Sequence, residues 1–451
     1  MVSEWKDAKL GDYIDSCLGK MLDKNKNTGE FHPYLGNSNV RWGAFELDEL
    51  SEMKFESHEH ERYGIKKGDL IVCEGGEPGR CAIWNEDVPD MKIQKALHRV
   101  RTLAGLDGDY LYYWFLFSAR AGHIDPYFTG TTIKHLTGKA LKELPIKIPP
   151  MRYQQEAAKL LRGFDNKITL NRQINQTLEQ MAQTLFKSWF VDFDPVMDNA
   201  LDAGNPIPDE LQHRAEARKA VRESEGFKPL PDDVRQLFPD AFEESELGWV
   251  PKGWDVTALG NLVTVKRGGS PRPIKDFIVP EGLPWVKISD ATSSACRFLS
   301  ETKEFIREEG LKKTVYLKSG SLILSNSATP GLPKFLDLDA CIHDGWLYFP
   351  HKEKLSDKYL YQLFEEIRPA LVRMGNGSVF TNLKTDILKA HQLLVASENV
   401  LTYFDDQLAN LHKKIHSVEQ ESRTLTKLRD TLLPKLISGE LRLDEIEAAV
   451  E

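Results

Sequence analysis

Polar residues in two loops carry the chemistry that this chain could direct at another molecule. The segments Glu74–Arg80 and Gly130–His135 combine glycine-rich turns with Arg, Lys, His and Thr side chains. Arg, Lys, Asn and Gln make most base-edge contacts in the DNA major groove, while Ser, Thr and backbone N–H groups bind phosphates. The loops therefore indicate nucleic-acid binding. The alternative for each single residue is an ordinary solvated loop position.

Motifs typical of enzymes are missing from the sequence. There is no Gly-x-x-x-x-Gly-Lys-Ser/Thr loop and no Gly-x-Gly-x-x-Gly after a strand. His58-Glu59-His60 lacks the i, i+4 spacing of a helical zinc site, which favours a solvated charged turn. Asp125–Phe128 is similar to the Asp-Pro-Pro-Tyr loop of amino-methyltransferases but lacks the second proline, so we interpret it as a turn. We expect a non-catalytic binding or scaffolding protein that holds no metal and no cofactor itself.

The elements that must position these loops occur twice in the chain. Asp109–Tyr112 returns as Lys358–Tyr361, and Gly68–Ile71 returns as Gly320–Ile323, roughly 250 residues later and in the same order. A repeat this long is a duplicated domain rather than a solenoid unit. Two copies in one chain suit a target that is itself in two parts.

The two copies share positions in their loops but not residue types. Glu74–Arg80 aligns with Asn326–Leu332, and Gly130–His135 aligns with Gly377–Asn382. This divergence is expected if each copy reads a different DNA sequence. The candidate DNA contacts are Arg80, Lys92, Lys95, His98, Arg99, Lys134 and His135 in the first copy, and Arg267, Arg272, Lys275, Asn326, Ser327, Lys334, Asn376 and Asn382 in the second.

A long helix is expected after each copy. Apolar positions at alternating spacings of three and four predict a coiled-coil seam, and each position in the first helix recurs 240 residues later. We expect the helices to pair antiparallel, because each follows its own domain. The alternative is two amphipathic helices that each pack only on their own domain. The seam residues are Phe164, Ile168, Leu178 and Leu185 in the first helix, and Phe404, Leu408, Leu411, Ile415, Val418 and Leu425 in the second.

Two polar residues interrupt the first seam. Asn171 and Asn175 lie at seam positions and have no polar equivalents in the second copy. A buried Asn usually sets the register of a coiled coil at some cost in stability. The alternative is a solvated edge of the helix.

Charge and composition limit the class of protein. The net charge is −9, but residues 191–248 alone contribute −9 and residues 437–451 contribute −4, so the remainder sums to about +4. The repeats are therefore mildly basic, which permits DNA binding. The five cysteines form no C-x-x-C pair, and we find no membrane-spanning run and no signal-peptide pattern. We expect a cytoplasmic protein with reduced thiols that does not associate with membranes.

Three further segments resemble one family. Phe186–Pro195 resembles the central conserved region of type I restriction-modification specificity subunits, and Leu428–Leu441 resembles their C-terminal conserved region. Glu246–Trp254, followed by Leu259-Gly260, is similar to the entry of their second target-recognition domain. The resemblance covers nearly the whole chain, and the Phe-Lys-Ser-Trp-Phe and Leu-Leu-Pro-Lys-Leu-Ile-Ser-Gly-Glu runs are specific.

The resemblance implies an α+β fold in which two strand-containing target-recognition domains are separated by two long helices in an antiparallel coiled coil, with pseudo-two-fold internal duplication. We expect a first domain over 1–150, a central helix over 151–190, an acidic connector over 191–248, a second domain over 249–397, a C-terminal helix over 398–436 and a tail over 437–451. The connector departs from the family pattern and is expected to be only partly structured.

The resemblance also implies a function without catalysis in this chain. Each domain would read one half of a bipartite, asymmetric site in double-stranded DNA, and the helices would dock two modification (methyltransferase) subunits. Restriction subunits with translocase and nuclease activity would join that core. S-adenosylmethionine, ATP and Mg would belong to the partners, which act in adenine methylation and DNA cleavage. A seam of 26 residues spans roughly 38 Å, close to one DNA turn of about 34–36 Å.

Two other functions compete with this one. The net negative charge also suits a scaffold or anti-restriction protein that binds the modification subunits with little DNA specificity. A methyltransferase carried in this chain is the third hypothesis, and it predicts S-adenosylmethionine binding by the isolated chain. The sequence does not define the DNA site recognised or the length of its spacer.

Overall fold

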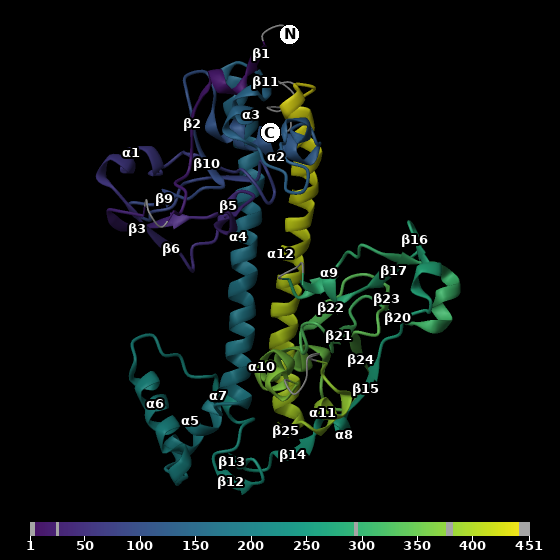
Figure 1. Cartoon of the computed structure of the whole chain (residues 1–451). Helices are drawn as coiled ribbons and strands as arrows, with labels where there is room; N and C mark the ends of the chain where they lie inside the picture. Colours follow the sequence, from purple (N-terminus) through teal and green to yellow (C-terminus); the bar gives the residue numbers. More distant parts are fainter. Residues whose placement is uncertain (1–4, 24–26, 293–295, 376–381, 442–451) are drawn as a thin grey trace. The chain divides into compact units, whose positions relative to one another are not determined.

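A computed structural model describes residues 5–23, 27–292, 296–375 and 382–441 of the chain. It divides into two compact units, one formed by residues 1–170 and 422–451 and the other by residues 171–421. The two long helices, α4 (Met151–Phe190) and α12 (Glu398–Ser438), each contribute one part to each unit. They are drawn in blue-teal and yellow in Figure 1. No helix in the described part of the chain is long and apolar enough to cross a membrane.

The first unit contains a four-stranded sheet in the order β2-β10-β7-β8 and a three-stranded sheet in the order β6-β3-β9. A further pair, β1 with β11, is antiparallel and closes the domain next to α4. The strands are β1 (Lys6–Lys9), β2 (Ile14–Leu18), β3 (Glu30–Leu35), β4 (Val40–Arg41), β5 (Ala44–Phe45), β6 (Ser51–Phe55), β7 (Leu70–Cys73), β8 (Cys81–Ile83), β9 (Lys92–Ile93), β10 (Leu97–Thr102) and β11 (Pro145–Ile148).

The described part of the first domain also contains the shorter α-helices α1 (His60–Tyr63), α2 (Gly108–Arg120) and α3 (Gly138–Glu143). Helix α2 begins at an N-cap because the Asp107 carboxylate accepts a hydrogen bond from the Tyr110 amide at 2.9 Å. Most of its residues are buried, so α2 forms the centre of the core between the sheet and the start of α4.

The second unit repeats this plan. The strand order β15-β24-β21-β22 matches β2-β10-β7-β8, the pair β14–β25 matches β1–β11, and α10, α11 and α12 follow as α2, α3 and α4 do. The additional strand β18 pairs with β22, and a second sheet has the order β16-β19-β17-β23-β20. This repetition confirms the internal duplication expected from the sequence.

The strands of the second domain are β14 (Asp255–Ala258), β15 (Val263–Arg267), β16 (Ile278–Val279), β17 (Leu283–Val286), β18 (Phe298–Leu299), β19 (Phe305–Ile306), β20 (Val315–Leu317), β21 (Leu322–Ser325), β22 (Pro333–Leu336), β23 (Ala340–Ile342), β24 (Trp346–Lys352) and β25 (Gln392–Val395). Its shorter helices are α8 (Leu259–Leu262), α9 (Ile288–Thr292), α10 (Asp357–Gly375) and α11 (Thr385–Ala390).

The acidic connector has more regular structure than its composition indicated. It contains α5 (Asp194–Ala203), α6 (Gln212–Glu223), α7 (Asp232–Arg235) and the hairpin of β12 (Phe242–Ser245) with β13 (Gly248–Pro251). Ion pairs explain part of this order, because Arg218 and Arg222 of α6 lie against the Asp198 carboxylate of α5. The connector was expected to be only partly structured, but acidic residues such as Asp198 and Asp202 are paired with arginines within the segment.

The long helices pack antiparallel in both units. In the first, the Arg429 guanidinium donates to the Asp165 carboxylate at 2.6 Å. In the second, the ring of Trp189 stacks on Tyr403 with centroids 6.1 Å apart. Residues later in α4 therefore meet residues earlier in α12, as the expected antiparallel coiled coil requires.

All ten seam residues have restricted exposure. Ile168, Phe404, Leu408, Ile415 and Val418 are buried, and Phe164, Leu178, Leu185, Leu411 and Leu425 are half-buried. Phe404 contacts Phe186 of α4 and also Tyr359 of α10. The helices thus pack both on each other and on the second domain, so the two alternatives weighed from the sequence are not exclusive.

Asn171 is buried within this helix pair rather than at a solvated edge. Its exposure is 0%, and its amide nitrogen donates to the carboxylate of Glu421 in α12 at 2.9 Å. Asn175 is half-buried. The Asn171–Glu421 bond favours the register-setting role for Asn171, because a shifted register would leave a buried amide without this partner.

Candidate nucleic-acid interface

In the first domain, three loops meet at the backbone of Glu74. The Glu74 carbonyl accepts a hydrogen bond from the Leu136 amide at 2.7 Å, and the Glu74 amide donates to the Ala96 carbonyl at 2.8 Å. These bonds join the β7–β8 loop to the loop before β10 and to the segment before α3. The loop residues selected from the sequence therefore come from segments that the backbone holds together.

In the second domain, Asn326 occupies the same position. Its carbonyl accepts from the Leu383 amide at 2.7 Å, and its amide donates to the Gly345 carbonyl at 2.8 Å. The same three loops meet, although the side chain is an amide in place of a carboxylate. Because the bonds involve only backbone atoms, loop side chains can change without loss of this junction.

The first-domain loops are ordered by contacts within them. The Arg80 guanidinium donates to the Glu77 carboxylate and to the Asn37 carbonyl, each at 3.0 Å. The Trp42 indole N–H also donates to Glu77, at 2.7 Å. Arg80 is therefore half-buried and engaged in holding the β7–β8 loop.

The loop before α3 presents an exposed tip. Reciprocal backbone hydrogen bonds of 2.8 Å between Thr129 and His135 close its base. The residues between them, including Lys134, are exposed, and the Lys134 ammonium lies 5.9 Å from the centre of the Phe128 ring. A closed base with an exposed cationic tip suits contact with a phosphate or a base edge.

In the second domain, four polar side chains gather around Asp344. Its carboxylate accepts from the Ser270 hydroxyl at 2.8 Å and lies 2.9 Å from the His343 ring and 3.4 Å from the Arg272 guanidinium. The Arg267 Nε–H donates to the Asp344 carbonyl at 2.6 Å. Burial raises the pKa of the Asp344 carboxyl, but the Ser270 hydrogen bond and the nearby positive charges lower it by more. The pKa of Asp344 is therefore below its usual value. The carboxylate is therefore an ionised acceptor near neutral pH.

Five candidate contacts are buried. Their side chains have little exposed surface with which to reach a groove, so the structure gives them no support as DNA contacts, and their assignment to DNA stays a prediction. The five are Lys92, His98, Arg99, Asn326 and Lys334, with exposures of 3%, 0%, 4%, 3% and 4%.

The partners of the buried candidates explain their polarity. Arg99 donates to the Asp15 carboxylate at 3.0 Å, and Lys334 donates to the Cys296 carbonyl. The His98 ring nitrogen Nε2 bonds the Leu136 carbonyl at 2.9 Å. Burial lowers the pKa of His98 and of Lys334, although the nearby carboxylates of Glu365 and Glu179 partly oppose this at Lys334.

The remaining candidates that lie within the described residues have accessible side chains. Lys95, Lys134, Arg267, Arg272, Lys275 and Asn382 are exposed, and Arg80, His135 and Ser327 are half-buried. Asn376 lies outside the described residues. The exposed set is mainly cationic, as a DNA-facing surface requires.

Sequence reasoning missed Asp344 and His343. An Asp-Gly pair after an apolar run is usually a turn, so Asp344 was not distinguishable from an ordinary turn residue. Its position is recognisable only when the two copies are matched through their backbone hydrogen bonds. This comparison places the segment Gln94–Ala96 and the segment His343–Gly345 at the same point of the duplicated fold.

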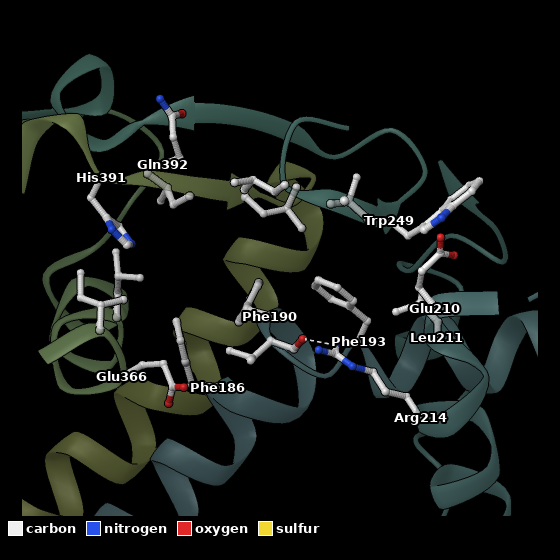
Figure 2. A pocket seen from close by; sticks show the side chains of 18 of the residues that line it. Phe186, Phe190, Phe193, Glu210, Leu211, Arg214, Trp249, Glu366, His391 and Gln392 are labelled. Carbon is white, nitrogen blue, oxygen red and sulfur yellow. Dashed lines mark hydrogen bonds between the residues drawn. The ribbon is translucent and has the colours of Figure 1, made fainter. Parts of the chain in front are cut away.

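A separate cavity of about 540 Å³ lies in the second unit, and its described lining residues include none of the candidate contacts. It is lined by the aromatic end of α4, the connector, α10 and β25, and Figure 2 shows Phe186, Phe190, Phe193 and Trp249 among its lining residues. The Arg214 guanidinium donates to the Val191 carbonyl at its edge, at 2.7 Å. The aromatic run at the end of α4 therefore packs against the connector, as the contact of Trp189 with Phe238 shows.

Comparison with known proteins identifies the duplicated fold. The family model described as "Type I restriction modification DNA specificity domain" matches residues 2–180 and 251–420, which are the two copies. The chain belongs to the type I restriction-modification specificity family. It is therefore a DNA sequence-recognition subunit, the non-catalytic component of a type I restriction-modification system. Its partners are of three kinds: DNA, methylase subunits and restriction subunits.

Relatives of this specificity subunit match over most of their length. The HindI specificity subunit of Haemophilus influenzae is 26% identical over 482 residues, covering 98% of this chain and 100% of the relative. The MjaIX specificity subunit of Methanocaldococcus jannaschii is 25% identical over 392 residues, covering 84% and 79%. The solved S subunit from M. genitalium has a TM-score of 0.54 at 16% identity and covers 96% of each chain, which supports the fold.

Proposed function

We propose that each domain of this specificity subunit reads one half of a bipartite, asymmetric site in double-stranded DNA. The observation that carries the proposal is the junction at Glu74 and Asn326, where identical backbone bonds hold three loops whose side chains differ. Base edges are read by side chains. Recognition of two different half-sites therefore requires loops with the same backbone arrangement and different polar side chains.

The exposed candidates divide into two roles. Lys134, Lys275 and Arg272 carry positive charge at exposed positions and are suited to phosphates or guanine edges. Asn382 has an amide that can bond adenine bidentately. Each half-site is then read by one domain alone, because every loop at a junction belongs to a single copy.

The long helices are proposed to dock two modification subunits. In this account S-adenosylmethionine is bound by those subunits, and ATP and Mg serve the restriction subunits. The described residues contain no group of three or more His, Cys, Asp or Glu side chains placed to hold a metal ion. The proposal assigns to this chain only DNA recognition and assembly.

An exchange of domains tests the proposal. Residues 1–150 are replaced by the first domain of another family member, and the sites methylated by the reconstituted complex are determined. One half-site is expected to change while the other remains. An unchanged target, or a change in both halves, would contradict the assignment of one half-site to each domain.

A further inference from the structure

The loop between β9 and β10 and the loop between β23 and β24 are the same structural element in the two domains. Each loop contains three residues. In each, the amide of the residue that follows the loop donates a hydrogen bond to the carbonyl of the first loop residue: Leu97 to Gln94 at 3.2 Å, and Trp346 to His343 at 3.0 Å. The carbonyl of the last loop residue accepts a hydrogen bond from the amide of the junction residue, which is Glu74 in the first domain and Asn326 in the second.

A second strand holds each loop from the other side. In the first domain, the Gly19 amide donates to the Leu97 carbonyl at 2.9 Å. In the second, the Gly268 amide donates to the Trp346 carbonyl at 2.8 Å. A Cβ on Gly19 would lie 2.4 Å from the Gln94 carbonyl oxygen, and one on Gly268 would lie 2.4 Å from the His343 carbonyl oxygen. The close approach allows only glycine, so the backbone of both loops is fixed in the same way.

The central residue of this fixed loop has opposite chemistry in the two copies. It is Lys95 in the first domain, which is exposed and has no ion-pair partner among the residues that the structure describes. It is Asp344 in the second, whose side chain is 30% exposed and is held by Ser270, His343 and Arg272. An ammonium only donates hydrogen bonds, and an ionised carboxylate only accepts them.

Each side chain matches a different set of base edges. In the major groove, Lys pairs with the O6 and N7 acceptors of guanine, whereas Asp accepts from the amino group of cytosine. Asp344 is also preorganised, because the His343 ring lies against Trp285 with centroids 5.3 Å apart and its Nδ1 accepts from the Gly345 amide at 2.8 Å. A fixed acceptor beside the exposed Arg272 can address both members of a cytosine–guanine pair.

We propose that Lys95 and Asp344 are specificity-determining residues, with Lys95 selecting guanine in the first half-site and Asp344 selecting an amino-bearing base, preferably cytosine, in the second. This inference rests on the proposed function and adds to it the positions that distinguish the two half-sites. The negative charge of Asp344 alone would argue against its presence on a DNA-binding surface. The inference gives this carboxylate a role in base recognition.

The test uses the complete chain assembled with a modification subunit and a plasmid library in which both half-sites are randomised. Methylated sites are read by long-read sequencing for the wild type, Asp344→Asn and Lys95→Gln. We expect Asp344→Asn to reduce the preference at one position of the second half-site by about tenfold, as loss of one good base contact does. Lys95→Gln is expected to act in the same way on the first half-site only.

Matched controls and a second variant separate specificity from folding. Asp339→Asn and Lys147→Gln change exposed or half-exposed residues of the same two domains outside these loops, and are expected to leave both half-sites unchanged. Lys95→Asp provides a test at an exposed position if Asp344→Asn does not fold, and it is expected to shift the preferred base in the first half-site.

The outcomes distinguish this inference from the proposed function. A bipartite wild-type motif with unchanged base preference in Asp344→Asn, Lys95→Gln and Lys95→Asp would overturn the inference and leave the function intact. A uniform decrease at all sites without a change in preferred base would also overturn it, because that result indicates a structural role. The absence of any wild-type motif would instead contradict the proposed function.

Discussion

Arg297 of the second domain forms a buried ion pair with Glu179 of α4. Arg297 is 3% exposed, and its guanidinium donates two hydrogen bonds to the carboxylate and lies 4.3 Å from the centre of the Tyr361 ring. Three elements therefore meet at one charge: the segment before β18, α10 and the long helix. This pair attaches the second domain to α4.

Removal of the acidic partner should destabilise the second unit strongly. Glu179→Gln leaves the Arg297 charge buried without its carboxylate, which typically costs about 3–5 kcal/mol. Urea unfolding followed by tryptophan fluorescence measures the loss. Glu156→Gln is the control, because Glu156 forms only a surface ion pair with Lys159 at 3.9 Å, and it should cost less than about 1 kcal/mol. Equal effects of the two variants would show that the Arg297 pair adds nothing to stability.

Charge in the helix seam should disrupt assembly before it alters sequence preference. Leu178 packs against the core of the second unit and Leu425 is half-buried. An aspartate at either position places a carboxylate in apolar surroundings, at a cost of several kcal/mol. Copurification with the modification subunit should fall sharply for Leu178→Asp and Leu425→Asp.

Exposed positions on the same helices provide the matched controls for the seam. Met181 is 54% exposed and Leu428 is 46% exposed, so Met181→Asp and Leu428→Asp place the same charge outside the seam. They should leave the folded helices intact. If Leu178→Asp and Leu425→Asp assembled normally, the seam would be misassigned.

Stability should decrease in mild acid because of His412 in α12. Burial between the rings of Phe298 and Phe335, together with the positive charges of Arg297 and Lys358, lowers the pKa of His412 to about 4. The unfolded chain binds this proton near pH 6.5, whereas the folded chain does so only near pH 4. The contribution is therefore fully present above pH 6.5 and is lost progressively as the pH falls toward 4.

The pH prediction is checked by the slope of the unfolding midpoint between pH 7 and pH 4.5. His412→Gln should flatten this slope relative to the wild type. His351→Gln changes a histidine whose side chain is 69% exposed and serves as the control. Parallel slopes in the wild type and His412→Gln would show that His412 titrates normally in the folded protein.

DNA binding by the assembled complex should weaken steeply with salt. Each phosphate neutralised contributes about −0.9 to the slope of log affinity against log salt concentration. Lys134→Ala should reduce the magnitude of that slope by about one if the exposed tip contacts a phosphate. Lys159→Ala, with a side chain 80% exposed on α4, is the control. A shallow slope for the wild type would instead favour a scaffold with little DNA affinity.

Much of the fold was predictable because it depends on patterns that the sequence repeats. The apolar spacing of α4 and α12 predicted two long paired helices, and buried Ile168 and Phe404 lie where that spacing requires. The connector was less predictable, because its order depends on ion pairs between its own helices, such as Arg218 of α6 with Asp198 of α5. Composition records the number of charges but not which of them pair.

The candidate interface was predictable only in part, for a similar reason. Both Lys95 and Lys92 are candidate DNA contacts by residue type, yet Lys95 is exposed and Lys92 is buried. Exposure depends on the pairing of β9 with β3, a contact between distant segments. Asp344 was missed because its role depends on an equivalence between the two domains that lies in backbone hydrogen bonds rather than in residue type.

The most direct test of the central claim is a map of adenine methylation in a host that expresses this chain with its modification subunit. Long-read sequencing of the genome should reveal a bipartite methylated motif, and that motif should disappear when this chain is omitted. The absence of a motif, in cells where the two subunits form a stable complex, would contradict the claim that the chain recognises a specific DNA sequence.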